Sequence, residues 1–219
     1  MKPVVVAVFA HPDDEAFGPG GTLAVFSRTH DVYIITVTGG EAGKNSLASK
    51  NSKLADIRKK ELLASAKILG VKKVFFLGFR DGTLSNNIYH KIASEIDAKL
   101  IKLQPNIVIT FEQGGVSGHI DHISVHFITT FVVKKLLNKP ELWYYFVPDT
   151  HSSLAPDYFI HYPTPPKAKI AEKVILTSEV WETKKNAMLM HKSQAHDANR
   201  IIEHTKNLPK EEYFLIFKD

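Results

Sequence analysis

An unbroken apolar run opens the chain: residues 4–9 are four valines, one alanine and one phenylalanine. A strand with one face in water alternates apolar and polar side chains, whereas a continuous run is typical of a parallel strand covered on both faces. Such strands occur almost only where helices pack on both sides of the sheet. The run therefore predicts an α/β fold with this strand inside it.

Strands and helices alternate along the first two thirds of the sequence. Strands are predicted at residues 4–9, 32–37, 74–77, 107–111 and 142–147. Helices are predicted at residues 16–28, 53–69, 88–103 and 120–131, the last with Ile120, Ile123, Phe127 and Phe131 on its apolar face. This alternation predicts a doubly wound, mostly parallel sheet with the Rossmann-like strand order 3-2-1-4-5.

The order is less regular after residue 147. Residues 148–166 are rich in proline, and a strand at 174–176, helices at 179–190 and 198–206 and a last strand at 214–217 are expected beyond them. We find no linker that would separate two domains. The chain is therefore predicted to be a single domain over residues 1–219, with a core at 1–147 and an irregular C-terminal extension at 148–219.

Composition excludes several classes of site. The 219 residues include no cysteine, so a metal must be bound by imidazole and carboxylate, and disulfide scaffolds and cysteine nucleophiles are excluded. The net charge of +5 comes from scattered pairs such as Lys59-Lys60 and Lys134-Lys135, which does not favour nucleic-acid binding. No apolar stretch approaches the roughly 20 residues of a membrane span. We expect a cytoplasmic protein, and a homo-oligomer is possible.

Two clusters of histidine and carboxylate follow predicted strands one and four. Residues 10–15 read Ala-His-Pro-Asp-Asp-Glu, and residues 118–122 read Gly-His-Ile-Asp-His. In the predicted strand order these two strands are neighbours, and ligand sites of open α/β sheets form where the strand order reverses. We therefore expect the two clusters to face each other across one crevice.

The residue types in these clusters are those of a zinc site. His11 and Asp14 are three residues apart, as are His119 and His122, so each pair can come from one helical turn. Two imidazoles and one carboxylate are a common zinc set, and zinc lowers the pKa of a bound water to about 7. A remaining carboxylate can accept the proton of this water, and a remaining histidine can protonate a leaving amine.

Simpler interpretations exist for each cluster. A lone histidine is usually a surface or core residue, and Asp13 and Asp14 could cap a helix N-terminus. Capping does not predict a second cluster on the adjoining strand, however. The glycine-rich residues 18–21 fit close packing of the first helix against the sheet better than a phosphate loop, because they lack the phosphate-loop spacing and lysine.

Together the two clusters resemble the paired signature of the LmbE-like, PIG-L-type deacetylases, and most closely those of the bacillithiol pathway. That family removes acetyl groups from N-acetylglucosamine conjugates. The segments that share the resemblance are residues 38–43, 58–62 and 77–82, together with Lys184 and residues 191–194. The sequence departs from these relatives at residues 114–119 and after residue 147.

The resemblance implies one Zn²⁺ per chain, although another divalent metal is possible. It assigns the metal ligands to His11, Asp14 and His122. It makes Asp13 the general base that accepts a proton from the attacking water. The implied substrate is a small amino-sugar conjugate, and the implied reaction is hydrolysis of its acetamide.

The resemblance also implies roles for five further residues. His119 would steady the oxyanion or protonate the leaving amine, and Asp121 would orient an imidazole ligand. Glu41, Arg58 and Asp81 match sugar-binding positions of some members. We expect a compact substrate with a small acidic group, because Arg58 and nearby lysines are basic and the glycine-containing loop at 38–52 could close over it.

Several alternatives stay open at this point. Arg58 and Glu61 could be a pair on a helix surface, and His191 and Gln194 could be polar caps at a helix end. The chain could be a zinc hydrolase of another amide or an ester, since the same water and base serve both reactions. It could also be a metal-binding interaction module without activity, but a spare carboxylate at Asp13 favours an enzyme. A metal-free nucleotide-binding domain is disfavoured by the missing glycine-rich turns.

Overall fold

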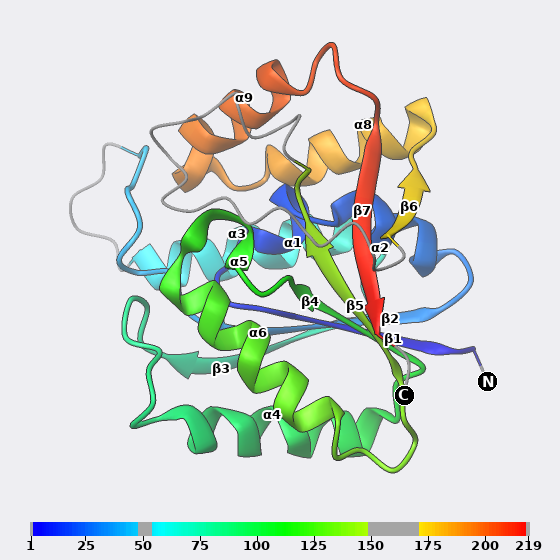
Figure 1. Cartoon of the computed structure of the whole chain (residues 1–219). Coiled ribbons are helices and arrows are strands. Elements are labelled where there is room, and N and C mark those ends of the chain that lie inside the picture. The colour runs from blue at the N-terminus through cyan, green and yellow to red at the C-terminus, as the bar shows by residue number, and fades with distance from the viewer. Residues whose placement is uncertain (1, 48–53, 149–170, 218–219) are drawn as a thin grey trace.

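The computed structural model describes residues 2–47, 54–148 and 171–217 of the chain. Within these residues the strands form one seven-stranded sheet in the order β3-β2-β1-β4-β5-β7-β6 (Figure 1). The strands are β1 Val4–Phe9, β2 Asp31–Thr38, β3 Lys73–Phe79, β4 Ile107–Phe111, β5 Glu141–Phe146, β6 Ala171–Ile175 and β7 Glu211–Phe217. The first five are parallel, and the predicted order 3-2-1-4-5 is confirmed.

Strand β1 lies in the middle of the parallel part of the sheet. Val5 pairs with Val32 of β2 on one side and with Ile107 of β4 on the other. From Val5 to Phe9 every side chain of β1 is fully buried. The prediction from the unbroken apolar run is thus confirmed, because both faces of this strand are covered.

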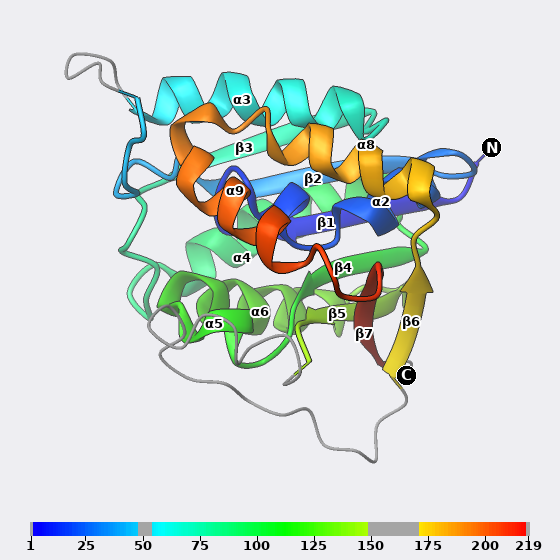
Figure 2. The same cartoon turned by 90° about the horizontal axis from the view of Figure 1, so that it is seen from above.

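Helices cover both faces of the sheet. The helices are α1 Asp14–Phe17, α2 Gly20–Ser27, α3 Leu54–Ile68, α4 Tyr89–Leu103, α5 Gly115–Gly118, α6 Ile120–Val133, α8 Ser178–Met188 and α9 Ala195–His204, with the 3-10 helix η1 Lys192–Gln194. Figures 1 and 2 show α2, α3, α8 and α9 on one face and α4 and α6 on the other. The described helices include none that is long and apolar enough to span a membrane.

The predicted single helix at residues 16–28 is wrong. The chain instead forms the short helix α1 and then α2, with Gly18 and Pro19 between them. Pro19 has no backbone N–H, so a helix cannot run through it without losing a hydrogen bond. The break limits α1 to one short turn, which carries Asp14 and Glu15.

The predicted apolar face of α6 is also partly wrong. Ile120 and Phe127 are exposed, whereas Val125, Ile128 and Val132 are buried against the rest of the core. The helix carries apolar side chains on more than one side, so periodicity alone selected a stripe that includes its outer face. Packing against β1 and β4 selects the other one.

The C-terminal part of the chain completes the sheet. Residues 171–217 form regular elements near the predicted positions, so the expectation of an irregular extension is wrong for this part. Strand β7 is antiparallel to both β5 and β6, and α8 packs on α2 and α3. The predicted proline-rich loop lies, beyond residue 148, outside the described residues.

A buried ion pair joins β7 to α8, and its carboxylate also binds the start of α2. Lys184 Nζ lies 2.6 Å from Glu212 Oε1, and both side chains are buried. The same carboxylate accepts hydrogen bonds from the backbone amides of Gly21 at 2.9 Å and Thr22 at 2.6 Å. An internal carboxylate thus occupies the helix N-terminus at which a phosphate would bind. A Cβ at Gly21 would lie 2.4 Å from Leu176, which agrees with the prediction of close packing in this stretch.

We predict that Glu212→Ala lowers the free energy of unfolding by about 3–5 kcal/mol, because it leaves Lys184 buried without its carboxylate. The matched control is Glu179→Ala, which removes an exposed pair between α8 and Arg28, the residue after α2, and should cost about 1 kcal/mol or less. Urea unfolding measures both. Equal costs for the two variants would contradict this account.

Candidate active site

Four neighbouring parallel strands deliver the site residues at their carboxyl ends. His11 and Asp14 follow β1, and Asp81 follows β3, while β4 leads into the turn and helix that carry Asp121 and His122. The loop after β2 is tied to this edge because Thr38 donates its backbone N–H and its hydroxyl to the carbonyl of Ala10. The two predicted clusters therefore meet, as the strand order requires.

Three side chains converge on one point. His11 Nδ1 lies 3.0 Å from His122 Nε2 and 3.6 Å from Asp14 Oδ2, and His122 Nε2 lies 3.2 Å from Asp14 Oδ1. Ligand atoms bound tetrahedrally to zinc at about 2.0–2.1 Å are themselves about 3.3 Å apart. The donor types and their spacing fit a zinc ion.

The opposite nitrogen of each imidazole is held by a second group. His122 Nδ1 lies 3.0 Å from the carbonyl oxygen of Gly115 and donates to it, which leaves the Nε2 lone pair for a metal. Its ring also stacks on Phe111 with centroids 4.1 Å apart. His11 Nε2 lies 2.9 Å from Asp81 Oδ1 and 3.4 Å from Asp121 Oδ2. Both rings are therefore oriented before any metal binds.

The site favours positive charge at His11. Burial by itself lowers the pKa of His11, but the carboxylates of Asp121 and Asp81 and the charge of Asp14 raise it to about 10. Burial raises the pKa of Asp14, yet His122 and His11 outweigh it and hold that pKa well below its usual range. A protonated His11 thus supplies the positive charge that a metal ion would otherwise bring to these carboxylates.

Two further donor groups lie close together around His11. In one, His11, His119 and His122 each offer a nitrogen, and in the other His11 is joined by Asp81 and Asp121, with atoms within 4.8 Å of one another in each. The carboxylates of the second group already accept backbone hydrogen bonds: Ala42 donates to Asp81, and Gly82 and Leu84 donate to Asp121. Both oxygens of Asp121 and both of Asp81 are thus engaged inside the protein, the second Asp81 oxygen by His11. Asp14 accepts a backbone N–H only at Oδ2, and its Oδ1 faces His122. This difference favours a supporting role for Asp81 and Asp121.

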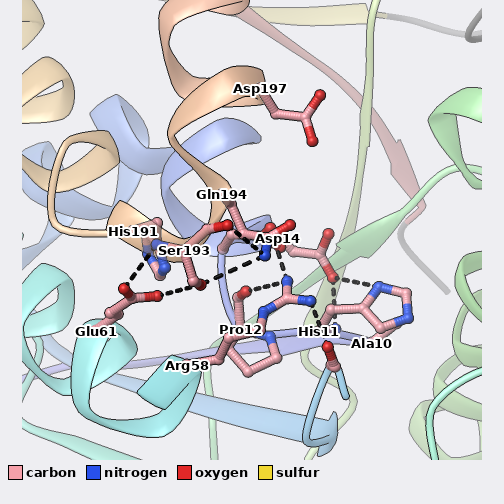
Figure 3. Close-up of polar contacts among 12 residues, drawn as sticks. Ala10, His11, Pro12, Asp14, Arg58, Glu61, His191, Ser193, Gln194 and Asp197 are labelled. Atoms are coloured by element: carbon pink, nitrogen blue, oxygen red, sulfur yellow. Dashed lines mark hydrogen bonds and ion pairs between the residues drawn. The ribbon is translucent and has the colours of Figure 1, made fainter. Parts of the chain in front are cut away.

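Asp13 has an unusual backbone and a buried carboxylate. Its φ of 128° lies where residues other than glycine are strained, at a cost of about 1–3 kcal/mol. Arg58 Nη2 donates to Asp13 Oδ2 at 2.7 Å and to the carbonyl of Pro12 at 2.6 Å, as Figure 3 shows for Pro12. Among the described residues nothing donates to Oδ1, so this oxygen is available to a water molecule. Burial raises the pKa of Asp13 to about 6, although Arg58 opposes the shift.

His119 is the exposed member of the cluster. Its Nδ1 accepts a hydrogen bond from the backbone N–H of Asp121 at 3.2 Å and so caps α6. Partial burial and the charges of His122 and His11 lower its pKa. A neutral ring that accepts at Nδ1 carries its proton at Nε2, so His119 presents an N–H donor.

Arg58 differs from its sequence interpretations. It is 4% exposed, and besides Asp13 and Pro12 its guanidinium binds the carbonyl of Gly40 at 2.6 Å. Arg58 and Glu61 are both buried, so the alternative of a surface pair is wrong. The guanidinium binds acceptors in the segments after β1 and β2, so it is not presented to an anionic ligand.

Hydrogen bonds link Asp81 to Glu41 and to the next residue, Ala42, at the rim of the site. The backbone N–H of Asp81 donates to Glu41 Oε1 at 3.1 Å, while Asp81 binds His11 and the amide of Ala42 with its own carboxylate. Both Asp81 oxygens are thus occupied inside the protein. Of these two residues, only Glu41 has an exposed side chain.

The C-terminal segment also reaches the site. Figure 3 shows His191, Ser193 and Gln194 close to Glu61 and Arg58. Ser193 binds the buried Glu61 through its N–H at 2.8 Å and its hydroxyl at 2.6 Å. Gln194 Nε2 donates to the carbonyl of Lys44, and the N–H of Ser46 donates to the carbonyl of Ser193. His191 and Gln194 do occupy the N-cap positions of η1 and α9, as the capping interpretation requires, but neither side chain forms a capping hydrogen bond. The last two bonds hold the described part of the predicted closing loop, residues 38–47.

Sequence reasoning missed the roles of two buried glutamates near the site. Glu15 accepts hydrogen bonds from Ser65 and from the backbone of Asp13, and Glu112 accepts from the backbone amides of Gly114 and Val116. Two signals were present in the sequence. Ser65 lies on the apolar stripe of α3, and Glu112 directly follows a buried strand.

The chain belongs to the PIG-L family: residues 6–133 match the family model described as "PIG-L: GlcNAc-PI de-N-acetylase". It is 35% identical over 128 residues to the "Probable N-acetyl-alpha-D-glucosaminyl L-malate deacetylase 2" of Bacillus cereus. It is 37% identical over 160 residues to the "1D-myo-inositol 2-acetamido-2-deoxy-alpha-D-glucopyranoside deacetylase" of Corynebacterium diphtheriae. These alignments cover 56% and 63% of this chain but only 57% and 55% of the two relatives. The predicted family is confirmed.

Solved structures share the fold over almost the whole chain. The A40926 pseudoaglycone deacetylase Dbv21 has a TM-score of 0.77 at 18% identity, covering 100% of this chain and 98% of its own. The N,N'-diacetylchitobiose deacetylase of Pyrococcus horikoshii has a TM-score of 0.70 at 24% identity, covering 99% and 84%. GalB, the 4-carboxy-2-hydroxymuconate hydratase of Pseudomonas putida, has a TM-score of 0.76 at 16% identity, covering 99% and 97%. Because deacetylases and a hydratase share it, the fold does not determine the reaction.

We predict that the zinc-loaded protein retains about one zinc per chain after dialysis, and that His11→Ala and His122→Ala lose it, because each removes one of three converging donors. His90→Ala changes an exposed histidine away from the cluster and should retain the zinc of wild type. Metal analysis of the purified variants measures this. Zinc contents of His122→Ala and His90→Ala that match would refute the site.

Proposed function

We propose that the chain is a zinc-dependent hydrolase that removes the acetyl group from an N-acetylglucosamine conjugate. The observation that carries this proposal is the convergence of His11, Asp14 and His122 beside Asp13, a carboxylate with no metal-binding contact of its own. The two relatives from Bacillus cereus and Corynebacterium diphtheriae, both named as deacetylases, support the same reaction class.

His11, Asp14 and His122 would hold the metal through Nδ1, a carboxylate oxygen and Nε2. When bound there, zinc polarises a carbonyl and makes a water molecule acidic enough to lose its proton near neutral pH. Asp13 would accept that proton at Oδ1 and return it to the leaving amine, while Arg58 holds Oδ2. The raised pKa of Asp13 supports this role, because a base works best when its pKa lies near the working pH.

His119 would donate a hydrogen bond from Nε2 to the oxyanion that forms when water attacks the acetyl carbon. The backbone N–H at its Nδ1 fixes this tautomer, and the lowered pKa keeps the ring neutral. Of the two roles that the sequence left open, we therefore favour oxyanion stabilisation, since a neutral imidazole is a weak donor of a full proton.

Asp121 and Asp81 would orient His11, and Arg58 would hold Asp13 and the loop after β2. These are supporting roles, and for Arg58 and Asp81 they replace the sugar-binding roles implied by the sequence. Glu41 stays the candidate for binding a sugar hydroxyl, because its carboxylate is at the exposed rim. The buried Arg58 also removes one reason to expect an anionic substrate.

A second candidate function is hydrolysis of an ester at the same site. Any acyl group that can place its carbonyl between the metal and His119 would meet the same base. Acetate release from N-acetylglucosaminyl malate, compared with release from an activated acetyl ester, separates the two reactions. A specificity constant for the ester that far exceeds every amide value would favour the esterase.

We predict that Asp13→Asn keeps about one zinc per chain and loses turnover by on the order of 10²-fold or more, because the side chain can no longer accept a proton. Asp14→Asn is the matched control, one residue away, and should lose zinc. Metal analysis and an assay of released amine measure the pair. If Asp13→Asn loses zinc while Asp14→Asn retains it, the two aspartates are assigned backwards.

The substrate is tested by comparing specificity constants for N-acetylglucosaminyl malate, N-acetylglucosaminyl inositol and N,N'-diacetylchitobiose. We expect the malate or the inositol conjugate to be preferred, as the curated relatives support. A clear preference for chitobiose would indicate a groove for sugar chains. Absence of amine release from all three by zinc-loaded wild type would overturn the proposed function.

A further inference from the structure

A buried histidine–glutamate pair is hydrogen-bonded to the backbone of Asp13 and supplies none of the proposed metal ligands. His191 and Glu15 are 0% and 1% exposed, and His191 Nε2 lies 2.7 Å from Glu15 Oε1. Glu15 is the last residue of the acidic cluster after β1, whereas His191 lies in the C-terminal segment, 58 residues beyond the stretch that matches the family model at 6–133. The pair therefore joins two distant parts of the chain.

The carboxylate of Glu15 accepts three hydrogen bonds. His191 and the hydroxyl of Ser65 both donate to Oε1, the latter at 2.6 Å. The backbone N–H of Asp13 donates to the other oxygen, Oε2, at 3.0 Å. Among the described residues His191 Nδ1 has no hydrogen-bond partner, so all of its polar contact is made through Nε2.

The amide that Glu15 accepts belongs to a strained residue. Asp13 holds a φ of 128°, and a residue with a Cβ keeps such a conformation only where its surroundings enforce it. Arg58 fixes the side chain of Asp13 and the preceding carbonyl, and Glu15 fixes its backbone N–H. Loss of the second anchor would let the backbone relax and move the carboxylate from its place beside the metal ligands.

We propose that His191 is a positioning residue for the reaction: through its Nε2–H it fixes the Glu15 carboxylate, which in turn holds Asp13 in its strained, catalytically competent conformation. This inference rests on the proposed function of Asp13 as the base. It assigns a catalytic purpose to the C-terminal segment, beyond completing the sheet.

The charges around His191 agree with this arrangement. Burial lowers the pKa of His191, but Glu15, Asp13 and Glu61 raise it more, and the net shift is upward. The ring is therefore well suited to donate to Glu15. Its edge also contacts Phe17 of α1, with centroids 5.7 Å apart, so the ring cannot turn away freely.

Two amide substitutions separate positioning from mere packing. Glutamine at position 191 places its N–H₂ near the former Nε2, and asparagine places it near the former Nδ1, which faces no partner. We expect His191→Gln to keep kcat within a few-fold of wild type. We expect His191→Asn to lower kcat by on the order of 10²-fold with KM little changed, since misplacing a catalytic group by about 1 Å has an effect of this size. Lys192→Ala, at the exposed next residue, should match wild type.

Zinc content and hydrogen exchange of the Asp13 amide complete the experiment. All four proteins should hold the same zinc, because the ligands are not touched. The Asp13 amide, followed by NMR, should exchange slowly in wild type, Lys192→Ala and His191→Gln, and at least about tenfold faster in His191→Asn, where its acceptor is no longer fixed. Equal exchange rates and equal kcat values in the glutamine and asparagine variants would overturn the inference, whatever their stability.

This design distinguishes the inference from the proposed function. If zinc-loaded wild type releases no amine from any acetylated sugar, the proposed function fails, and the exchange rates alone still decide whether His191 holds Asp13. If wild type is active and the asparagine variant is equally active, the proposed function stands and the positioning role fails.

Discussion

Buried negative charge around His11 is the constraint on which the site depends. The carboxylates of Asp14, Asp81 and Asp121 all lie against this one imidazole, at the carboxyl ends of parallel strands. Carboxylates out of water are stable only when a cation or several hydrogen bonds compensate them. The protein supplies backbone amides to all three and leaves the Nδ1 side of His11 facing His122. A divalent cation on that side would complete the compensation.

Backbone strain on both sides of the site is held by buried glutamates. Asp13 has a φ of 128°, and Glu15 accepts its amide. Val116, a β-branched residue with a φ of 66°, donates its amide to Glu112. The turn that Glu112 holds carries the carbonyl of Gly115, to which His122 donates. Each glutamate thus fixes the backbone next to one element of the site, the proposed base on one side and a proposed metal ligand on the other.

The sequence predicts the parallel sheet and the meeting of the two clusters. Apolar runs indicate buried strands, and the alternation of strands and helices indicates their order in the sheet. It does not predict contacts made by single polar residues from distant segments. His191 and Glu15 are 176 residues apart, and neither has a local signal for its partner. For Arg58 the helix pattern could not show that the side chain points into the loop after β2. The break at Pro19 was readable, since proline cannot continue a helix.

The central claim is that the metal lies on the Nδ1 side of His11, among Asp14 and His122. Anomalous diffraction from crystals of the zinc-loaded protein locates the ion directly. The account predicts one strong peak about 2.0–2.1 Å from His11 Nδ1 and from His122 Nε2. A peak on the Nε2 side of His11, between Asp81 and Asp121, would contradict it.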